Sequence, residues 1–189
     1  MEIGWIQSLA FLMSIAYVIL AARENIWCWF FGLIAVTLSF VVYYQNKLFS
    51  DATLQVFYMA VSVYGWYSWG KGREKQAALK ISTLTIYKHL WLLLLGIAGT
   101  ILLGYWWTFW NAALPFIDAF TTSFSIIATF LVARKILENW IYWLVIDTVC
   151  IYVYINRQIP LFALLFFVYD IIAVYGLLIW YRQMGKQSS

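Results

Sequence analysis

The stretch Tyr64-Gly65-Trp66-Tyr67-Ser68-Trp69 is matched 111 residues later by the stretch Tyr175-Gly176-Leu177-Leu178-Ile179-Trp180. The matching tyrosine, glycine and tryptophan hold the same spacing in both copies. Further matches occur upstream at spacings of 111 to 114 residues: Tyr58 with Tyr169, Glu24-Asn25 with Glu138-Asn139, and Trp29 with Trp143. Several matches in register predict that the chain contains an internal repeat.

The composition is that of a membrane protein. Hydrophobic residues make up 65% of the 189 positions and charged residues only 11%, whereas soluble domains have about 45–50% and roughly 25%. No water-facing surface can be assembled from what remains, so the class is integral membrane. The net charge of +4 is carried by scattered residues, which argues against nucleic-acid binding.

Seven apolar runs approach the roughly 20 residues that a helix needs to cross a hydrocarbon core of about 30 Å. Short polar breaks separate most of them, and only residues 70–88 form a long connection. The predicted transmembrane helices cover residues 5–22, 27–45, 51–69, 89–107, 116–133, 139–154 and 160–181.

The basic residues lie mostly on one side of this predicted bundle. Only Lys47 and Arg157 belong to the other side. Because cytoplasmic loops carry the excess of Lys and Arg, we expect the N-terminus outside and the C-terminus inside a bacterial inner membrane. The ten residues of the cytoplasmic side are Arg23, Lys71, Arg73, Lys75, Lys80, Lys88, Arg134, Lys135, Arg182 and Lys186.

Together the repeat and the spans predict the fold. Each copy holds three helices, over residues 5–69 and 116–181, and one linker helix over residues 89–107 restores the same orientation for the second copy. We therefore expect an all-α single transmembrane domain over residues 1–189 with a 3+1+3 plan and a parallel pseudo-two-fold axis. Transporters with such repeats bind substrate near the midplane, where the repeats meet.

Two acidic residues lie deep in predicted spans. Asp147 is about eight residues into the sixth span, roughly 12 Å deep at 1.5 Å per residue, and Asp170 lies near the middle of the seventh. A charge at such depth costs at least about 2.5–3.5 kcal/mol, and no Lys or Arg lies at comparable depth. A cationic or proton-donating ligand could be the partner. The alternative is a protonated carboxyl group bonded to a neighbouring helix.

The residues Trp140, Trp143 and Asp147 are spaced i, i+3 and i+7, so they share one helical face. Two indoles and a carboxylate can stack a flat ring and bind its positive charge. The alternative is that the tryptophans pack the core or anchor the interface.

A second stripe on the third span combines polar and aromatic residues, and Tyr169 is the repeat counterpart of its Tyr58. Gln55 could hydrogen-bond a ring amide or amine, whereas the alternative is ordinary contact between helices. The stripe consists of Gln55, Tyr58, Ser62, Trp66 and Trp69. Glu24 and Glu138 precede helices, where acidic residues commonly stabilise the helix start.

No enzyme motif is present: the sequence has no HExxH, GxSxG or P-loop pattern and no paired Cys-His arrangement. We therefore expect neither catalysis nor a cofactor or metal. The last span has no mid-helix lysine for a retinal Schiff base, which excludes the most familiar class of seven-helix protein.

Four segments resemble the PnuC family of bacterial vitamin transporters, and the similarity covers nearly the whole chain. The family has a 3+1+3 fold similar in plan to the SWEET sugar carriers and forms trimers, so the resemblance implies a homotrimer. The segments are residues 30–38 (Phe30-Phe31-Gly32-Leu33-Ile34, then Val36-Thr37-Leu38), residues 54–57, residues 64–69 and Arg134-Lys135-Ile136-Leu137-Glu138-Asn139-Trp140-Ile141-Tyr142-Trp143.

The resemblance also implies which residues meet the substrate. In the nicotinamide riboside transporters of this family, Gln55 and a WxxW motif, here Trp140 and Trp143, correspond to residues at the substrate. The family's asparagine one turn later is Asp147 here, and Asp170 stands where an uncharged residue is usual. With Tyr58 and Trp66 of the polar and aromatic stripe and the repeat counterpart Tyr169 added, the predicted substrate-binding residues are Gln55, Tyr58, Trp66, Trp140, Trp143, Asp147, Tyr169 and Asp170.

The family includes transporters for nicotinamide riboside, thiamin, riboflavin and deoxynucleosides. The two added acids, Asp147 and Asp170, favour thiamin, which has a thiazolium cation and an aminopyrimidine that can donate to a carboxylate. Nicotinamide riboside is also cationic and stays as an alternative. The resemblance implies facilitated diffusion followed by trapping through a cytosolic vitamin kinase. A different class, a membrane subunit that captures a ligand but needs partner proteins, would show a docking surface of AxxxA spacing, which is not evident.

Overall fold

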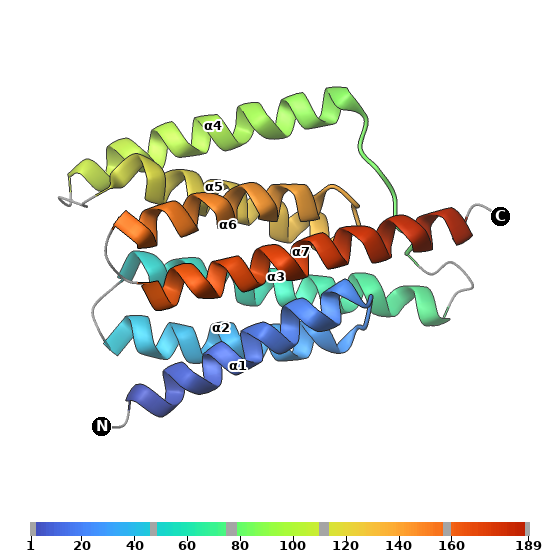
Figure 1. Cartoon of the computed structure of the whole chain (residues 1–189), viewed down its shortest axis with the longest axis horizontal. Coiled ribbons are helices and arrows are strands. Elements are labelled where there is room, and N and C mark those ends of the chain that lie inside the picture. The colour runs from blue at the N-terminus through green and yellow to red at the C-terminus, as the bar shows by residue number, and fades with distance from the viewer. Residues whose placement is uncertain (1–2, 46–48, 75–78, 110–113, 157–159, 188–189) are drawn as a thin grey trace.

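The computed structural model describes residues 3–45, 49–74, 79–109, 114–156 and 160–187. They form seven helices that run along one axis of a single bundle (Figure 1). The described residues contain no strand apart from an isolated parallel bridge between Ser82 and Ile136. The helices are α1 (Ile3–Ala22), α2 (Trp27–Gln45), α3 (Phe49–Glu74), α4 (Ile86–Thr108), α5 (Pro115–Ala133), α6 (Asn139–Asn156) and α7 (Pro160–Gln187).

The seven predicted spans correspond one to one with these helices, which confirms the all-helical fold class. The largest differences are at the ends of α3 and α7, which continue past residues 69 and 181 to Glu74 and Gln187, because a helix need not end where the hydrocarbon ends. Five helices are long and apolar enough to cross a membrane by length and composition alone. The other two, α3 and α6, carry the polar residues Gln55 and Asp147.

The two termini lie at opposite ends of the bundle (Figure 1). We call these the N-terminal end and the C-terminal end. The turn after α1, the turn after α5 and the segment before α4 all lie at the C-terminal end, and with them the described basic residues, such as Arg23, Arg134 and Lys80. Lys47, Arg157 and Lys75 lie outside the described residues. Which side of the membrane the C-terminal end faces stays a prediction.

The repeat is visible in backbone hydrogen bonds at the two turns. In the turn after α1, the Glu24 N–H donates to the Ala21 carbonyl at 3.0 Å, and in the turn after α5 the Lys135 N–H donates to the Val132 carbonyl at 3.0 Å. Glu24 and Lys135 also share a left-handed backbone conformation, with φ of 53° and 50°. The two turns are therefore the same structure, displaced by 111 residues.

This spacing corrects both sequence matches at 114 residues: Glu24 is equivalent to Lys135 and not to Glu138, and Trp29 is equivalent to Trp140 and not to Trp143. The Trp29 ring meets Trp69 edge-on at 5.5 Å and 88°, and the Trp140 ring meets Trp180 edge-on at 5.5 Å and 87°. The match of Glu24-Asn25 with Glu138-Asn139 suggested a spacing of 114. A shift of three residues is close to one helical turn, so the wrong alignment still kept similar residues on similar faces.

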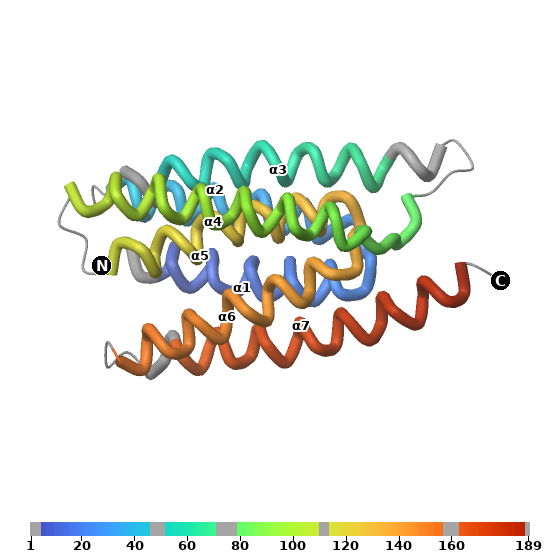
Figure 2. The backbone as a smooth tube through the Cα atoms, turned by 90° about the horizontal axis from the view of Figure 1, so that it is seen from above, coloured from blue at the N-terminus to red at the C-terminus, as the bar shows by residue number. Residues whose placement is uncertain are grey.

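The pairing of helices obeys the same symmetry. Within each copy the consecutive helices pack together, and between the copies α1 packs on α7 while α3 packs on α5. Exchanging the copies turns one of these inter-repeat contacts into the other. Figure 2 shows α3 and α7, which hold equivalent places, on opposite sides of the bundle. The linker helix α4 packs along α5 at the outer edge (Figure 1).

The larger buried core lies at the C-terminal end, where the two repeats meet. Its centre is a run of ring contacts that joins four tryptophans, two from each repeat: Trp29, Trp69, Trp180 and Trp140. In each repeat a glycine lies directly against one of these tryptophan rings. A Cβ atom on Gly176 would lie 2.7 Å from Trp140, and one on Gly65 would overlap Trp29. These glycines are required for the close approach of α7 to α6 and of α3 to α2.

Candidate substrate-binding site

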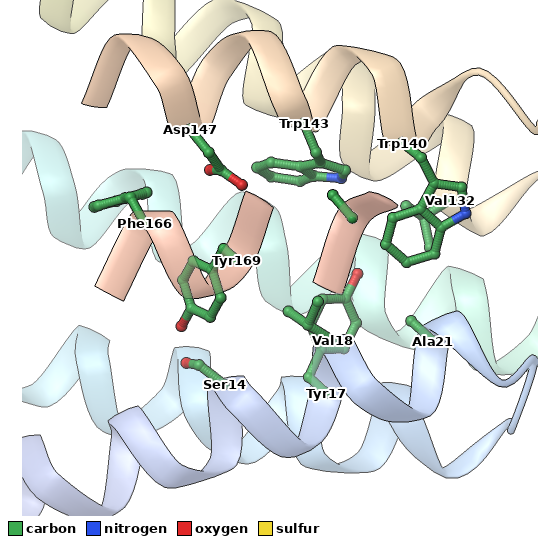
Figure 3. A pocket seen from close by; sticks show the side chains of 11 residues that line it. Ser14, Tyr17, Val18, Ala21, Val132, Trp140, Trp143, Asp147, Phe166 and Tyr169 are labelled. Carbon is green, nitrogen blue, oxygen red and sulfur yellow. The ribbon is translucent and has the colours of Figure 1, made fainter. Parts of the chain in front are cut away.

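A cavity of about 220 Å³ lies between the two repeats, where α1 meets α6 and α7 (Figure 3). Its position agrees with the expectation that parallel repeats form their site where they meet. Its wall is largely apolar with a few polar groups, as is usual for small-molecule sites. The lining residues are Ser14, Tyr17, Val18, Ala21, Val132, Trp140, Trp143, Asp147, Phe166, Tyr169 and Ala173.

One wall of the cavity is the predicted face of α6. Trp140, Trp143 and Asp147 follow one another along the helix and all border the cavity, with the Asp147 carboxylate directed into it (Figure 3). Asp147 is only 4% exposed and Trp140 only 2%. The i, i+3, i+7 spacing thus produces the expected combination of two indoles and a carboxylate.

The Asp147 carboxylate has no positively charged neighbour among the described residues. The acidic-to-basic side-chain contacts there are Lys135 with Glu24 at 2.5 Å and His89 with Glu138 at 3.5 Å, the second an ion pair only when the imidazole is protonated, and both lie at the C-terminal end. The charged residue that acts on Asp147 is a second acidic one, Asp170. A buried carboxylate in this setting is costly unless a partner arrives from outside the chain.

Asp170 lies beside the cavity and not in its wall. One carboxylate oxygen accepts a hydrogen bond from the Thr148 hydroxyl at 3.4 Å, and the other has no partner among the described residues. Asp170 therefore places a second carboxyl group near Asp147 without bordering the cavity.

The opposite wall comes from α1, which the sequence reasoning did not single out. Ser14 and Tyr17 border the cavity (Figure 3), and the Ser14 side chain hydrogen-bonds with that of Tyr169 on α7. The spacing of 111 could have found Ser14, since its repeat mate Ser125 makes the same bond to Tyr58, the mate of Tyr169. A span without charged residues offered no other signal.

Three predicted site residues on α3 do not border this cavity. Tyr58 lies in the equivalent seam between α3 and α5, where it bonds with Ser125, and Gln55 is one helical turn before it. Trp66 is 38% exposed and meets Trp27 edge-on at 5.5 Å on the bundle surface. The reason is the symmetry: α3 in the first repeat corresponds to α7 in the second, so its stripe faces the other seam.

The fold and the site define a multi-pass membrane transporter for a small molecule. Comparison with known proteins identifies its family. The model of the family described as "Nicotinamide mononucleotide transporter" matches residues 4–182, so the chain belongs to that family, whose members are transporters and not enzymes. The resemblance to PnuC proteins is thereby confirmed.

Individual relatives cover nearly the whole chain. The nicotinamide riboside transporter PnuC of Escherichia coli (strain K12) is 27% identical over 100% of this chain and 90% of the relative. The riboflavin/roseoflavin transporter RibM of Streptomyces davaonensis is 24% identical over 99% of this chain and 89% of the relative. A crystal structure of the vitamin B3 transporter PnuC matches with a TM-score of 0.78 at 26% identity, covering 97% of this chain and 83% of that chain. These names do not bear on the expected thiamin branch.

Proposed function

We propose that this protein takes up a small aromatic vitamin that carries a positive charge, by facilitated diffusion. The observation that supports this most strongly is the Asp147 carboxylate, which is buried, faces the cavity and has no cationic partner among the described residues. A flat cation stacked against Trp143 would supply that partner and gain from the indole as well. A neutral ligand would leave the carboxylate uncompensated.

Thiamin is the first candidate substrate. Its thiazolium ring gives a fixed positive charge for the field of Asp147 and Asp170, and its aminopyrimidine can donate to a carboxylate oxygen. Nicotinamide riboside is the second candidate, because two relatives that are named nicotinamide riboside transporters match over nearly the full length of the chain. It is also a cationic ring compound, so the charge of Asp147 serves either vitamin.

The proposed mechanism needs no energy source in the chain. The vitamin crosses down its gradient, and a cytosolic vitamin kinase traps it as a phosphate. The C-terminal end, with its excess of Lys and Arg, faces the cytoplasm, and the family resemblance favours a homotrimer. The competing function, a capture subunit that needs partners, predicts that purified protein binds the vitamin but cannot transport it.

Quenching of tryptophan fluorescence on titration with thiamin and nicotinamide riboside tests the substrate, using detergent-purified protein. We expect Asp147→Asn to weaken binding of the preferred vitamin at least tenfold, since hydrogen bonds to charged groups contribute about 1.5–3 kcal/mol and 1.4 kcal/mol is tenfold. Asp118→Asn, which removes a carboxylate in the first turn of α5 outside the cavity lining, is the matched control. Unchanged affinity for both vitamins in Asp147→Asn would refute the proposed role of the carboxylate.

A further inference from the structure

The two repeats differ at one reciprocal pair of positions beside the cavity. In the first repeat a large ring stands on the first helix, Tyr17, beside a small residue on the second, Gly32. In the second repeat the equivalent positions, 111 residues later, hold small Ala128 on the first helix and large Trp143 on the second. Ring and small residue have exchanged places between the copies.

Close contacts accompany this exchange. A Cβ atom on Gly32 would lie 2.9 Å from the ring of Tyr17, so the ring lies directly over the glycine. Trp143 packs against the cluster of buried residues that contains Ala128. The Tyr17 ring thus occupies the space that Gly32 leaves open, and Trp143 packs against the cluster to which the small Ala128 belongs.

The exchange breaks the two-fold symmetry between the repeats and brings both large rings to one cavity. Trp143 reaches the cavity from α6 of the second repeat, and Tyr17 reaches it from α1 of the first (Figure 3). Two large aromatic residues therefore face the same cavity from opposite repeats. Strict symmetry would instead give each seam one such ring.

The Tyr17 hydroxyl group points into the cavity (Figure 3), and none of the hydrogen bonds among the described residues uses it. The ring itself is fixed by Gly32 beneath it and by an edge-on contact with Trp29 at 5.9 Å and 61°. Tyr17 is half-buried, and a tyrosine hydroxyl that faces a largely apolar cavity favours a hydrogen-bond partner there. A ligand in the cavity can supply one.

We infer that Tyr17 is a substrate-contacting residue that determines specificity, and that Gly32 is a positioning residue that holds its ring at the cavity. The inference rests on the proposed function. Trp143 and Asp147 recognise the charged ring of the vitamin from one wall, and the Tyr17 hydroxyl recognises a hydroxyl, amine or amide of the same molecule from the other. Vitamins that present different polar groups at that wall are then distinguished by this residue.

The test is a double-substitution cycle on purified protein, with dissociation constants for thiamin, nicotinamide riboside and riboflavin as the readout. Gly32→Ala should push the Tyr17 ring into the cavity and weaken binding of the preferred vitamin at least tenfold. In a Tyr17→Ala background, Gly32→Ala should change affinity by less than twofold, since the ring on which it acts is gone. Tyr17→Leu provides the same background if Tyr17→Ala does not fold. Gly70→Ala, whose Cβ would meet Ile26 at an ordinary 3.6 Å, is the control.

Tyr17→Phe removes only the hydroxyl group and should change the ratio of affinities among the three vitamins at least fivefold. An equal loss from Gly32→Ala in both backgrounds, or an unchanged ratio in Tyr17→Phe, would overturn the inference while the proposed function stands. Failure of the unaltered protein to bind any of the three vitamins would overturn the proposed function and this inference with it.

Discussion

The ion pair between Glu24 and Lys135 offers a sharp test of how the two repeats are joined. The two residues hold equivalent places in the repeats, and they meet at the C-terminal end with 2.5 Å between Lys135 Nζ and Glu24 Oε2. Each side chain is only 13% exposed, and the ammonium group also lies 4.8 Å from the ring centre of Trp69. One contact therefore links the turn of the first repeat to that of the second.

We predict that removing one partner is costly and that removing both is much less so. Loss of one member of a buried pair strands the other charge and costs about 3–5 kcal/mol, and the residual exposure places this pair near the lower value. The double variant leaves no charge stranded. The coupling energy should therefore reach about 2 kcal/mol, within the range for residues in direct contact.

Thermal unfolding of purified Glu24→Gln, Lys135→Met and the double variant measures this coupling. Both single variants should melt well below the unaltered protein. The loss of melting temperature in the double variant should be smaller than the two single losses added together. Lys80→Met, which removes an exposed lysine at the same end, controls for the change of net charge. Additive losses in the double variant would refute the reasoning, because they would mean that the two charges do not interact.

Three further predictions follow from the same structure. Gly176→Ala and Gly104→Ala should each cost about 1–3 kcal/mol of stability by overpacking an aromatic ring, Trp140 and Phe116 respectively, but only Gly176→Ala, whose neighbour Trp140 lines the cavity, should weaken vitamin binding markedly in the fluorescence titration; equal binding losses would contradict the assigned lining. Trp143→Leu should reduce binding at least tenfold, whereas Trp66→Leu, on the bundle surface, should change it less than threefold; the reverse order would restore the predicted α3 stripe as the site. A fluorescent protein fused after Gln187 should fluoresce in bacteria and an alkaline phosphatase fused there should be inactive, whereas an active phosphatase would reverse the predicted orientation.

The sequence was informative about the fold for a physical reason. A helix in hydrocarbon must satisfy all its backbone groups internally, so apolar length alone marks five of the spans. The less apolar α3 and α6 were found because polar breaks bound their apolar runs. The repeat then fixed the arrangement, since an odd number of helices per copy requires a linker such as α4. The error of three residues that paired Trp29 with Trp143 arose because helical periodicity tolerates a shift of nearly one turn.

The sequence predicted one wall of the candidate site and missed the other. Asp147 stood out because a carboxylate in hydrocarbon is costly, and the tryptophans on its face followed from their spacing. Tyr17 on α1 gave no comparable signal, because a tyrosine in an apolar helix looks like core or interface.

Uptake into proteoliposomes tests the central claim most directly. Purified protein in vesicles without any ion gradient should carry radiolabelled thiamin or nicotinamide riboside inward in a saturable way. Asp147→Asn should abolish most of that uptake and Asp118→Asn should retain it. Vesicles that take up neither vitamin, or that take one up equally well with Asp147→Asn, would contradict the account of a cavity built to carry a charged aromatic vitamin.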